Sequence, residues 1–152
     1  MDGRCTCGVV HYRMTARPLF VHACHCTWCQ RETGSAFALN AMIEAGLVEI
    51  VAGQPEEVVT PSASGRGQIV LRCGVCRVAL YSHYAGAGRK VAFVRVGTLD
   101  DPSGCPPDIH IFTATKLAWL VLDDRVPVVA EYYKWQDRWP AESIARREAM
   151  RG

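Results

Sequence analysis

Short runs of β-branched and aromatic residues recur along the whole chain, and turn-forming residues separate them. Runs of this kind, bounded by Gly, Pro, Asn or Ser, are typical of β-strands. The pattern predicts strands over residues 9–14, 19–23, 37–43, 47–51, 57–60, 68–72, 78–84, 91–96 and 109–113, and a last one over 126–130. We therefore expect a mostly β protein.

Helical patterning is limited to two stretches. Residues 28–33, followed by Gly34, predict one helical turn. Residues 141–150 are rich in Ala, Glu and Arg, which favour a short C-terminal helix. Residues 115–122 fit a helix or a turn. Loops are expected over 61–67 and 100–107, which are rich in Ser, Gly and Pro.

Composition narrows the class of protein. With 152 residues, 49% of them hydrophobic, the chain is expected to fold as one domain over 1–152. No apolar leader and no membrane-length apolar run occurs, so a cytoplasmic protein without a membrane partner is expected. The formal charge is +2, and ionising seven thiols around two zinc ions would bring it to about −1. A nucleic-acid partner is not expected, whereas a homo-oligomer stays open.

Three cysteines lie within six residues, at Cys24, Cys26 and Cys29. This crowding favours one metal ion over separate disulfides, particularly in a cytoplasmic chain. Structural zinc normally has four protein ligands, whereas a catalytic zinc keeps one position open. The sequence allows both: the site is open, or a further ligand closes it. The candidates for this further ligand are His22, His25, His110 and Cys105, and His22 is preferred. The His25 ring is expected to point away from the metal. His110 is expected to be a structural histidine, and Cys105 is expected to be a free thiol.

Two further cysteine pairs, Cys5 with Cys7 and Cys73 with Cys76, cannot complete a tetrahedral site separately. The simplest arrangement joins them in one closed structural zinc site, which would tie the N-terminus to a central hairpin. Structural zinc contributes about 10–16 kcal/mol of apparent binding free energy, comparable with the whole stability of a domain. Loss of this site should therefore unfold the protein.

An open three-thiolate zinc would carry a net charge of −1, which makes it a poor generator of hydroxide from water. It should prefer a soft ligand such as a substrate thiol. A thiol with a pKa near 8.5 is only about 3% ionised at neutral pH, and zinc would hold it as the thiolate. Addition of that thiol to a small aldehyde suits the predicted site better than hydrolysis does.

The cysteine pattern, followed by Pro107 to Phe112 and by Trp119, resembles the glutathione-dependent formaldehyde-activating enzyme (Gfa) family, which also contains centromere protein V-like proteins. The resemblance implies a β-tent fold of small antiparallel sheets organised around two zinc ions per chain. It implies a structural zinc at Cys5, Cys7, Cys73 and Cys76, and a catalytic zinc at Cys24, Cys26 and Cys29. It also implies a carbon–sulfur lyase that joins glutathione to formaldehyde as S-hydroxymethylglutathione.

One position departs from the family pattern. The residue after the last knuckle cysteine is usually glycine in the family, but here it is Arg77, so this turn is expected to differ.

No glutathione-binding signature stands out in the sequence. The candidate cations for a substrate carboxylate are Arg31, Arg66, Arg89 and Lys116, and Trp28 and Phe37 are candidate cavity walls. Two other functions stay open: a non-catalytic zinc module that presents a protein-interaction surface, and a metal or thiol-redox sensor.

Overall fold

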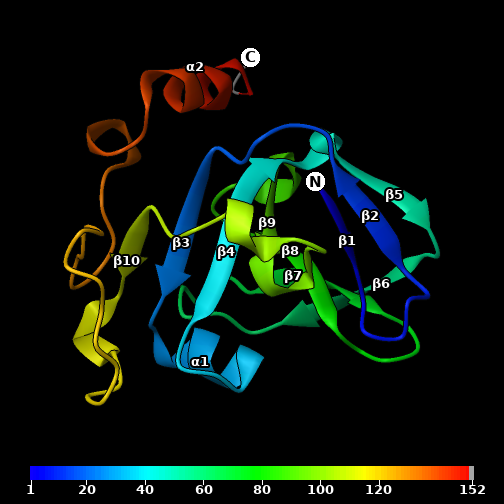
Figure 1. Cartoon of the computed structure of the whole chain (residues 1–152), viewed down its shortest axis with the longest axis horizontal. Helices are drawn as coiled ribbons and strands as arrows, with labels where there is room; N and C mark the ends of the chain where they lie inside the picture. The colour runs from blue at the N-terminus through cyan, green and yellow to red at the C-terminus, as the bar shows by residue number, and fades with distance from the viewer. Residues whose placement is uncertain (151–152) are drawn as a thin grey trace.

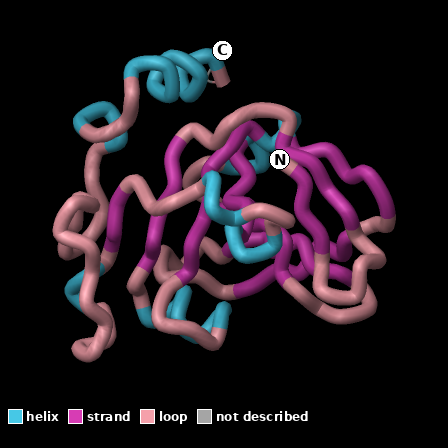
Figure 2. Tube along the Cα trace, viewed as in Figure 1, coloured by secondary structure: helices cyan, strands magenta, loops and turns pink. Residues whose placement is uncertain are grey.

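The computed structural model describes residues 1–150 and is built mainly of β-strands (Figure 1; Figure 2). The strands are β1 Asp2–Arg4, β2 His11–Met14, β3 Phe20–Cys24, β4 Ala38–Glu44, β5 Val48–Ala52, β6 Pro55–Thr60, β7 Gln68–Cys73, β8 Ala79–Tyr84, β9 Val91–Arg95 and β10 Ile109–Ile111. The α-helices are α1 Thr27–Thr33 and α2 Ala141–Ala149. Short 3-10 turns lie at Ala45–Leu47, Gly88–Lys90, Val96–Thr98, Pro102–Gly104, Thr113–Thr115 and Trp135–Asp137. The predicted mostly β class and short C-terminal helix are confirmed.

The strands form two sheets. The larger sheet has the order β10-β3-β4-β9-β8-β7-β6, and the smaller one has the order β1-β2-β5. Neighbouring strands pair antiparallel, as expected, except that β10 lies parallel to β3. That exception brings Ile111 beside Cys24, at the end of β3 where the three-cysteine stretch begins.

The two faces of the larger sheet bury different clusters of side chains. Val21 and Ala41 belong to a core that also contains Tyr12 of the smaller sheet. Phe20 and Met42, one residue away on the same strands, belong to a second cluster. This alternation follows from the two-residue repeat of a β-strand. The second face carries the candidate site.

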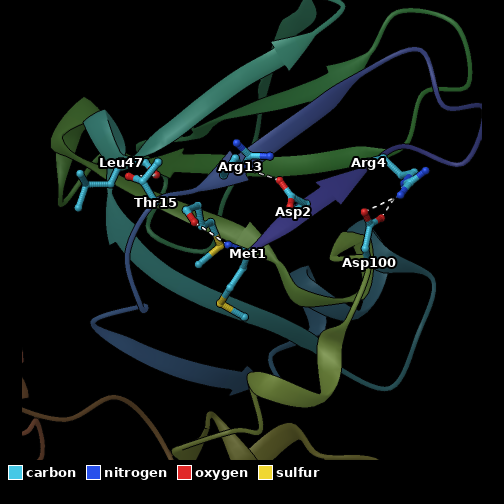
Figure 3. Close-up of polar contacts among 8 residues, drawn as sticks. Met1, Asp2, Arg4, Arg13, Thr15, Leu47 and Asp100 are labelled. Atoms are coloured by element: carbon cyan, nitrogen blue, oxygen red, sulfur yellow. Dashed lines mark hydrogen bonds and ion pairs between the residues drawn. The ribbon is translucent and has the colours of Figure 1, made fainter.

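Strand β1 is too short and polar for the hydrophobic pattern to predict. It forms because its partner β2 aligns it, with Gly3 opposite Tyr12. The Met1 amino group donates a hydrogen bond to the Met14 carbonyl over 2.8 Å, and Asp2 pairs with Arg13 (Figure 3). Arg4 pairs with Asp100 at the other end of β1 (Figure 3).

The chain after β10 passes along one edge of the larger sheet before it reaches α2 (Figure 1). The prediction of a strand over 126–130 is wrong, because only Val128 in this range makes a β-bridge, to His110. Hydrogen bonds such as Val129 N to His110 O, 2.9 Å, hold this segment in place as an irregular chain. Within the described residues, no helix combines the length and apolarity that a membrane crossing requires.

Candidate metal centres and active site

The β1–β2 and β7–β8 connections bring four cysteines together. The sulfurs of Cys5, Cys7, Cys73 and Cys76 all lie within 4.8 Å of one another. The Cys5–Cys7 sulfur distance is 3.5 Å and the Cys7–Cys73 distance is 3.7 Å. Metal–sulfur bonds of 2.3 Å in a tetrahedron place sulfurs about 3.8 Å apart. The four-sulfur set therefore fits a closed tetrahedral metal site.

Backbone amides support this set of sulfurs. Val10 N donates to Cys5 Sγ over 3.3 Å, and Val75 N donates to Cys73 Sγ over 3.4 Å. Hydrogen bonds from amides favour the thiolate, the form that binds metal. Cys5 and Cys73 are buried, so the set also belongs to the core between the sheets.

Arg77 takes the conformation that glycine usually supplies in such a turn. Its φ is 63°, in the left-handed region, and its amide donates to the Cys73 carbonyl over 3.0 Å. The backbone at Arg77 thus has a conformation that glycine adopts readily, although the side chain is an arginine. The arginine carries the associated strain.

Strand β3 and helix α1 position the three-cysteine set. Cys24 ends β3, Cys26 is the N-cap of α1, and Cys29 lies inside α1, which ends at Gly34 with φ 62°. The Cys29 amide donates to Cys26 Sγ over 3.3 Å, so the cap itself uses a candidate ligand. The three sulfurs lie within 4.8 Å of one another. The structure therefore brings together the three residues that the spacing predicts.

The three thiols cannot all ionise without a cation. Hydrogen bonds with Cys26 and Cys29 raise the pKa of Cys24, whereas hydrogen bonds with Cys24 and Cys29 lower the pKa of Cys26. One sulfur thus takes the negative charge and its neighbours keep their protons, as expected for like charges that share a small site. A metal ion would remove this competition.

His22, the preferred closing ligand, does not join the three sulfurs. Its Nε2 lies 2.6 Å from the Tyr133 hydroxyl, which also accepts a hydrogen bond from Trp139 Nε1 over 2.8 Å. The His22 tautomer decides which of the two groups donates in this hydrogen bond. Burial lowers the pKa of His22 to about 4, in agreement with a neutral ring.

The other closing candidates also lie outside the three-sulfur set, among residues 1–150. His25 points to His110, with 2.9 Å between Nε2 and Nδ1, which supports the expected structural role of His110. Cys105 is buried in the opposite core, with its sulfur 4.0 Å from that of Met1. None of the eight cysteines forms a disulfide in the structure, so both clusters are available to metal.

A cavity of about 480 Å³ opens over the three sulfurs. Its floor is the second face of the larger sheet, with Asn40, Met42 and Phe93 on it. Aromatic side chains from other elements complete the walls: Trp28, Tyr84, Phe112, Tyr132 and Trp135. The open side of the three-cysteine set therefore faces a mostly apolar space large enough for a small peptide or cofactor-sized ligand.

Only some candidate substrate contacts line this cavity. Trp28 and Arg66 do, whereas Phe37 packs against the His25 ring at 5.2 Å. Arg89 pairs with Glu57, and Lys116 donates to the backbone carbonyls of Leu117 and Leu120. Arg31 lies in the last turn of α1 and is absent from the lining. Arg66 is thus the predicted cation that the fold places at the cavity.

A family model described as glutathione-dependent formaldehyde-activating enzyme matches residues 1–115. The chain belongs to this family. The structure also resembles a crystal structure of a Rhodobacter sphaeroides protein from a structural-genomics programme. The two share 16% sequence identity, with a TM-score of 0.52 over 85% of this chain and 100% of that one, which supports the fold alone.

Part of the cavity lies beyond the segment that matches the Gfa family. Both cysteine clusters fall within residues 1–115, but Tyr132, Trp135 and Arg147 line the cavity from the C-terminal segment. The sequence pattern did not single out these three residues, nor Asn40 and Tyr84. Alternation along the strands paired with β3 is a signal that could have found Asn40, whereas nothing local places the C-terminal residues at the site.

Proposed function

We propose that this Gfa-family protein is a zinc-dependent enzyme of the carbon–sulfur lyase type that joins a thiol to a small aldehyde. Glutathione and formaldehyde are the expected pair, with S-hydroxymethylglutathione as the product. Cys24, Cys26 and Cys29 would hold the catalytic zinc. Cys5, Cys7, Cys73 and Cys76 would hold a structural zinc. The free state of all eight cysteines fits a reducing compartment such as the cytoplasm.

One observation carries the proposal: three sulfurs converge at a cavity, and no fourth His, Cys, Asp or Glu in residues 1–150 joins them. The other cluster has four sulfurs, and none of its cysteines lines this cavity. This difference matches the distinction between an open catalytic site and a closed structural one. A non-catalytic module would be expected to close both sites with its own ligands.

The donor sets fit zinc. Thiolate ligands in threes and fours select zinc over hard cations such as magnesium and calcium. A bound zinc would supply the positive charge that keeps a substrate sulfur as a thiolate at neutral pH. The reaction itself is balanced without an oxidant: the sulfur forms a bond to the carbonyl carbon, the C=O π bond becomes a C–O single bond, and the proton lost from sulfur is matched by one gained at oxygen.

The residues of the chain contribute position. The cavity walls would hold the thiol-bearing molecule so that its sulfur lies beside the three cysteines, and confinement of two reactants is a large source of rate enhancement. Arg66 and Arg147 line the same cavity, and guanidinium groups pair well with carboxylates. Two carboxylates are what glutathione offers at its ends. Trp28 supplies an apolar wall next to Cys29.

Exchange NMR on mixtures of glutathione and formaldehyde tests the proposal directly. Protein with two zinc ions per chain should accelerate interconversion between free and thiol-bound formaldehyde above the spontaneous rate. Cys26→Ser should stay folded, retain about one zinc per chain and return the rate to the spontaneous value.

Cys105→Ala is the matched control, because Cys105 is buried outside both clusters. It should keep two zinc ions and the wild-type rate. Equal acceleration by wild type and Cys26→Ser, or none by wild type with both zinc ions present, would rule out the proposed reaction at this site.

A further inference from the structure

Arg95 is a buried cation with no anionic partner among the described residues. It ends β9, and 7% of its surface is exposed. Its Nη1 donates to the side-chain oxygen of Asn40, while Nε and Nη2 are buried without a hydrogen-bond partner. No carboxylate in residues 1–150 forms an ion pair with it. Burial of a charged guanidinium is unfavourable unless an opposite charge lies close by.

The strand register places Arg95 on the face that carries the three-cysteine set. His22 of β3 lies opposite Asn40 of β4, and Asn40 lies opposite Arg95 of β9. Directly opposed residues share a face of the sheet, and residues two apart on a strand also share it. Cys24, two residues after His22, therefore lies on the same face as Arg95. Asn40 lies on β4, the strand between β3 and β9.

The contact with Asn40 agrees with this placement. Asn40 accepts a hydrogen bond from Arg95, and Asn40 lines the same cavity as Cys24, Cys26 and Cys29. Arg95 itself is not among the residues that line the cavity, so it would act on the sulfurs through its charge and not by contact with a ligand.

We propose that Arg95 is the built-in counter-charge of the three-cysteine metal site. Three thiolates and a divalent metal ion carry a net charge of −1, and one buried guanidinium brings the group to neutrality. A neutral partner such as Asn40 satisfies a donor but removes no charge. This inference rests on the metal-binding part of the proposed function and not on the thiol–aldehyde reaction.

Two consequences follow for the site. Arg95 should strengthen metal binding, because it stabilises the thiolates that the metal needs. It should also lower the energy of the sulfur electrons, because a nearby positive charge stabilises them. Arg95 is therefore a positioning residue that acts through the ligands.

Chelator competition on the zinc-loaded protein tests the first consequence. Wild type should release two zinc ions per chain in two steps, the weaker from the three-cysteine site. Arg95→Met, which keeps volume and removes charge, should weaken that step by about 10–100-fold, the range expected for loss of one nearby charge. Arg95→Lys should recover most of the affinity. Replacement of a buried unpaired charge by an apolar side chain is often tolerated by the fold.

Arg146→Met is the matched control, because it removes a partly buried arginine that pairs with Glu44, and neither residue belongs to either cysteine cluster. It should leave both zinc affinities unchanged. Wild-type affinity in Arg95→Met, or equal weakening in Arg146→Met, would overturn the inference. Release of a single zinc by wild type would instead refute the three-cysteine metal site of the proposed function.

Cobalt substitution gives a second readout that is independent of stability and activity. Without the counter-charge the sulfur electrons lie higher in energy, so the sulfur-to-cobalt charge-transfer band of Arg95→Met should shift to longer wavelength. Arg95→Lys and Arg146→Met should keep the wild-type band. An unshifted band in Arg95→Met would also overturn the inference.

Discussion

Arg77, which follows the last cysteine of the four-sulfur set, has a backbone conformation that is unfavourable for an arginine. Arg77 adopts φ 63°, and the left-handed region costs a non-glycine residue about 1–2 kcal/mol. Its ion pair with Glu56 is exposed at both ends, and such pairs are worth about 0–1 kcal/mol. The sulfurs on either side of the turn give the reason for the strain: the backbone must curl here for Cys73 and Cys76 to meet Cys5 and Cys7.

Arg77→Gly should therefore stabilise the zinc-loaded protein, by about 0.5–1 kcal/mol once the greater flexibility of unfolded glycine is included. Arg77→Ala is the control, because it removes the same ion pair and keeps the strain. Urea unfolding should rank Arg77→Gly above Arg77→Ala by about 1 kcal/mol. Equal stability of the two variants would mean that the turn relaxes without cost.

At the scale of elements, the C-terminal segment forms part of the site although it lies outside the family match. It carries Tyr132, Trp135 and Arg147 to the cavity. Helix α2 is tied to the sheet by Arg146, which donates to both Glu44 oxygens over 2.8 and 2.6 Å and to the Arg17 carbonyl over 3.0 Å. This contact joins α2 to the end of β4 and to the chain before β3.

Arg146→Met should lower the free energy of unfolding by about 1–3 kcal/mol at pH 7, the usual range for hydrogen bonds to a charged group. Burial tends to raise the pKa of Glu44, but the hydrogen bonds and the charge of Arg146, together with a backbone hydrogen bond, outweigh burial and hold this pKa below its ordinary value. A lowered carboxyl pKa stabilises the folded state above the ordinary pKa, and this stabilisation is lost as the pH falls through the lowered value. The difference between variant and wild type should therefore shrink below about pH 4.5.

Arg125→Met is the control for this prediction, because Arg125 pairs with Asp123 only two residues away and is exposed. Urea unfolding at several pH values should show almost no change for it. A loss of stability in Arg146→Met that is independent of pH would contradict the assigned role of Glu44.

For the whole molecule, the four-sulfur set links the two sheets. Cys5 and Cys7 follow β1 of the smaller sheet, whereas Cys73 is the last residue of β7 and Cys76 lies between β7 and β8 of the larger sheet. Without this link the smaller sheet would depend on its packing in the shared core and on contacts such as the Arg4–Asp100 pair. Bound metal at this position would therefore contribute to global stability.

Cys73→Ser should yield insoluble or protease-sensitive protein. Loss of a structural zinc removes about 10–16 kcal/mol, which exceeds or equals the stability of most domains. Circular dichroism and limited proteolysis would measure the effect, with Cys26→Ser as the folded comparison. A normal melting temperature for Cys73→Ser would contradict a structural role for the four-sulfur set.

The sequence by itself determined the features that depend on residue identity and short spacing. The two cysteine sets, the helical turn at α1 and the C-terminal helix at α2 were all predictable, because metal-ligand chemistry and helix signals act over a few residues. The mostly β class was predictable too, since the two-residue repeat of apolar side chains is local.

Only the tertiary structure decided which residues share the site. His22 does not join the three sulfurs, because it forms a hydrogen bond with Tyr133, 111 positions away. Residues 126–130 form one β-bridge, at Val128, and not a strand. The tertiary structure also placed Arg95 on the same sheet face as Cys24, through the registers of three strands. These outcomes depend on contacts between distant segments, whose geometry is set by the packing of the whole chain and leaves no signal in any short stretch of sequence.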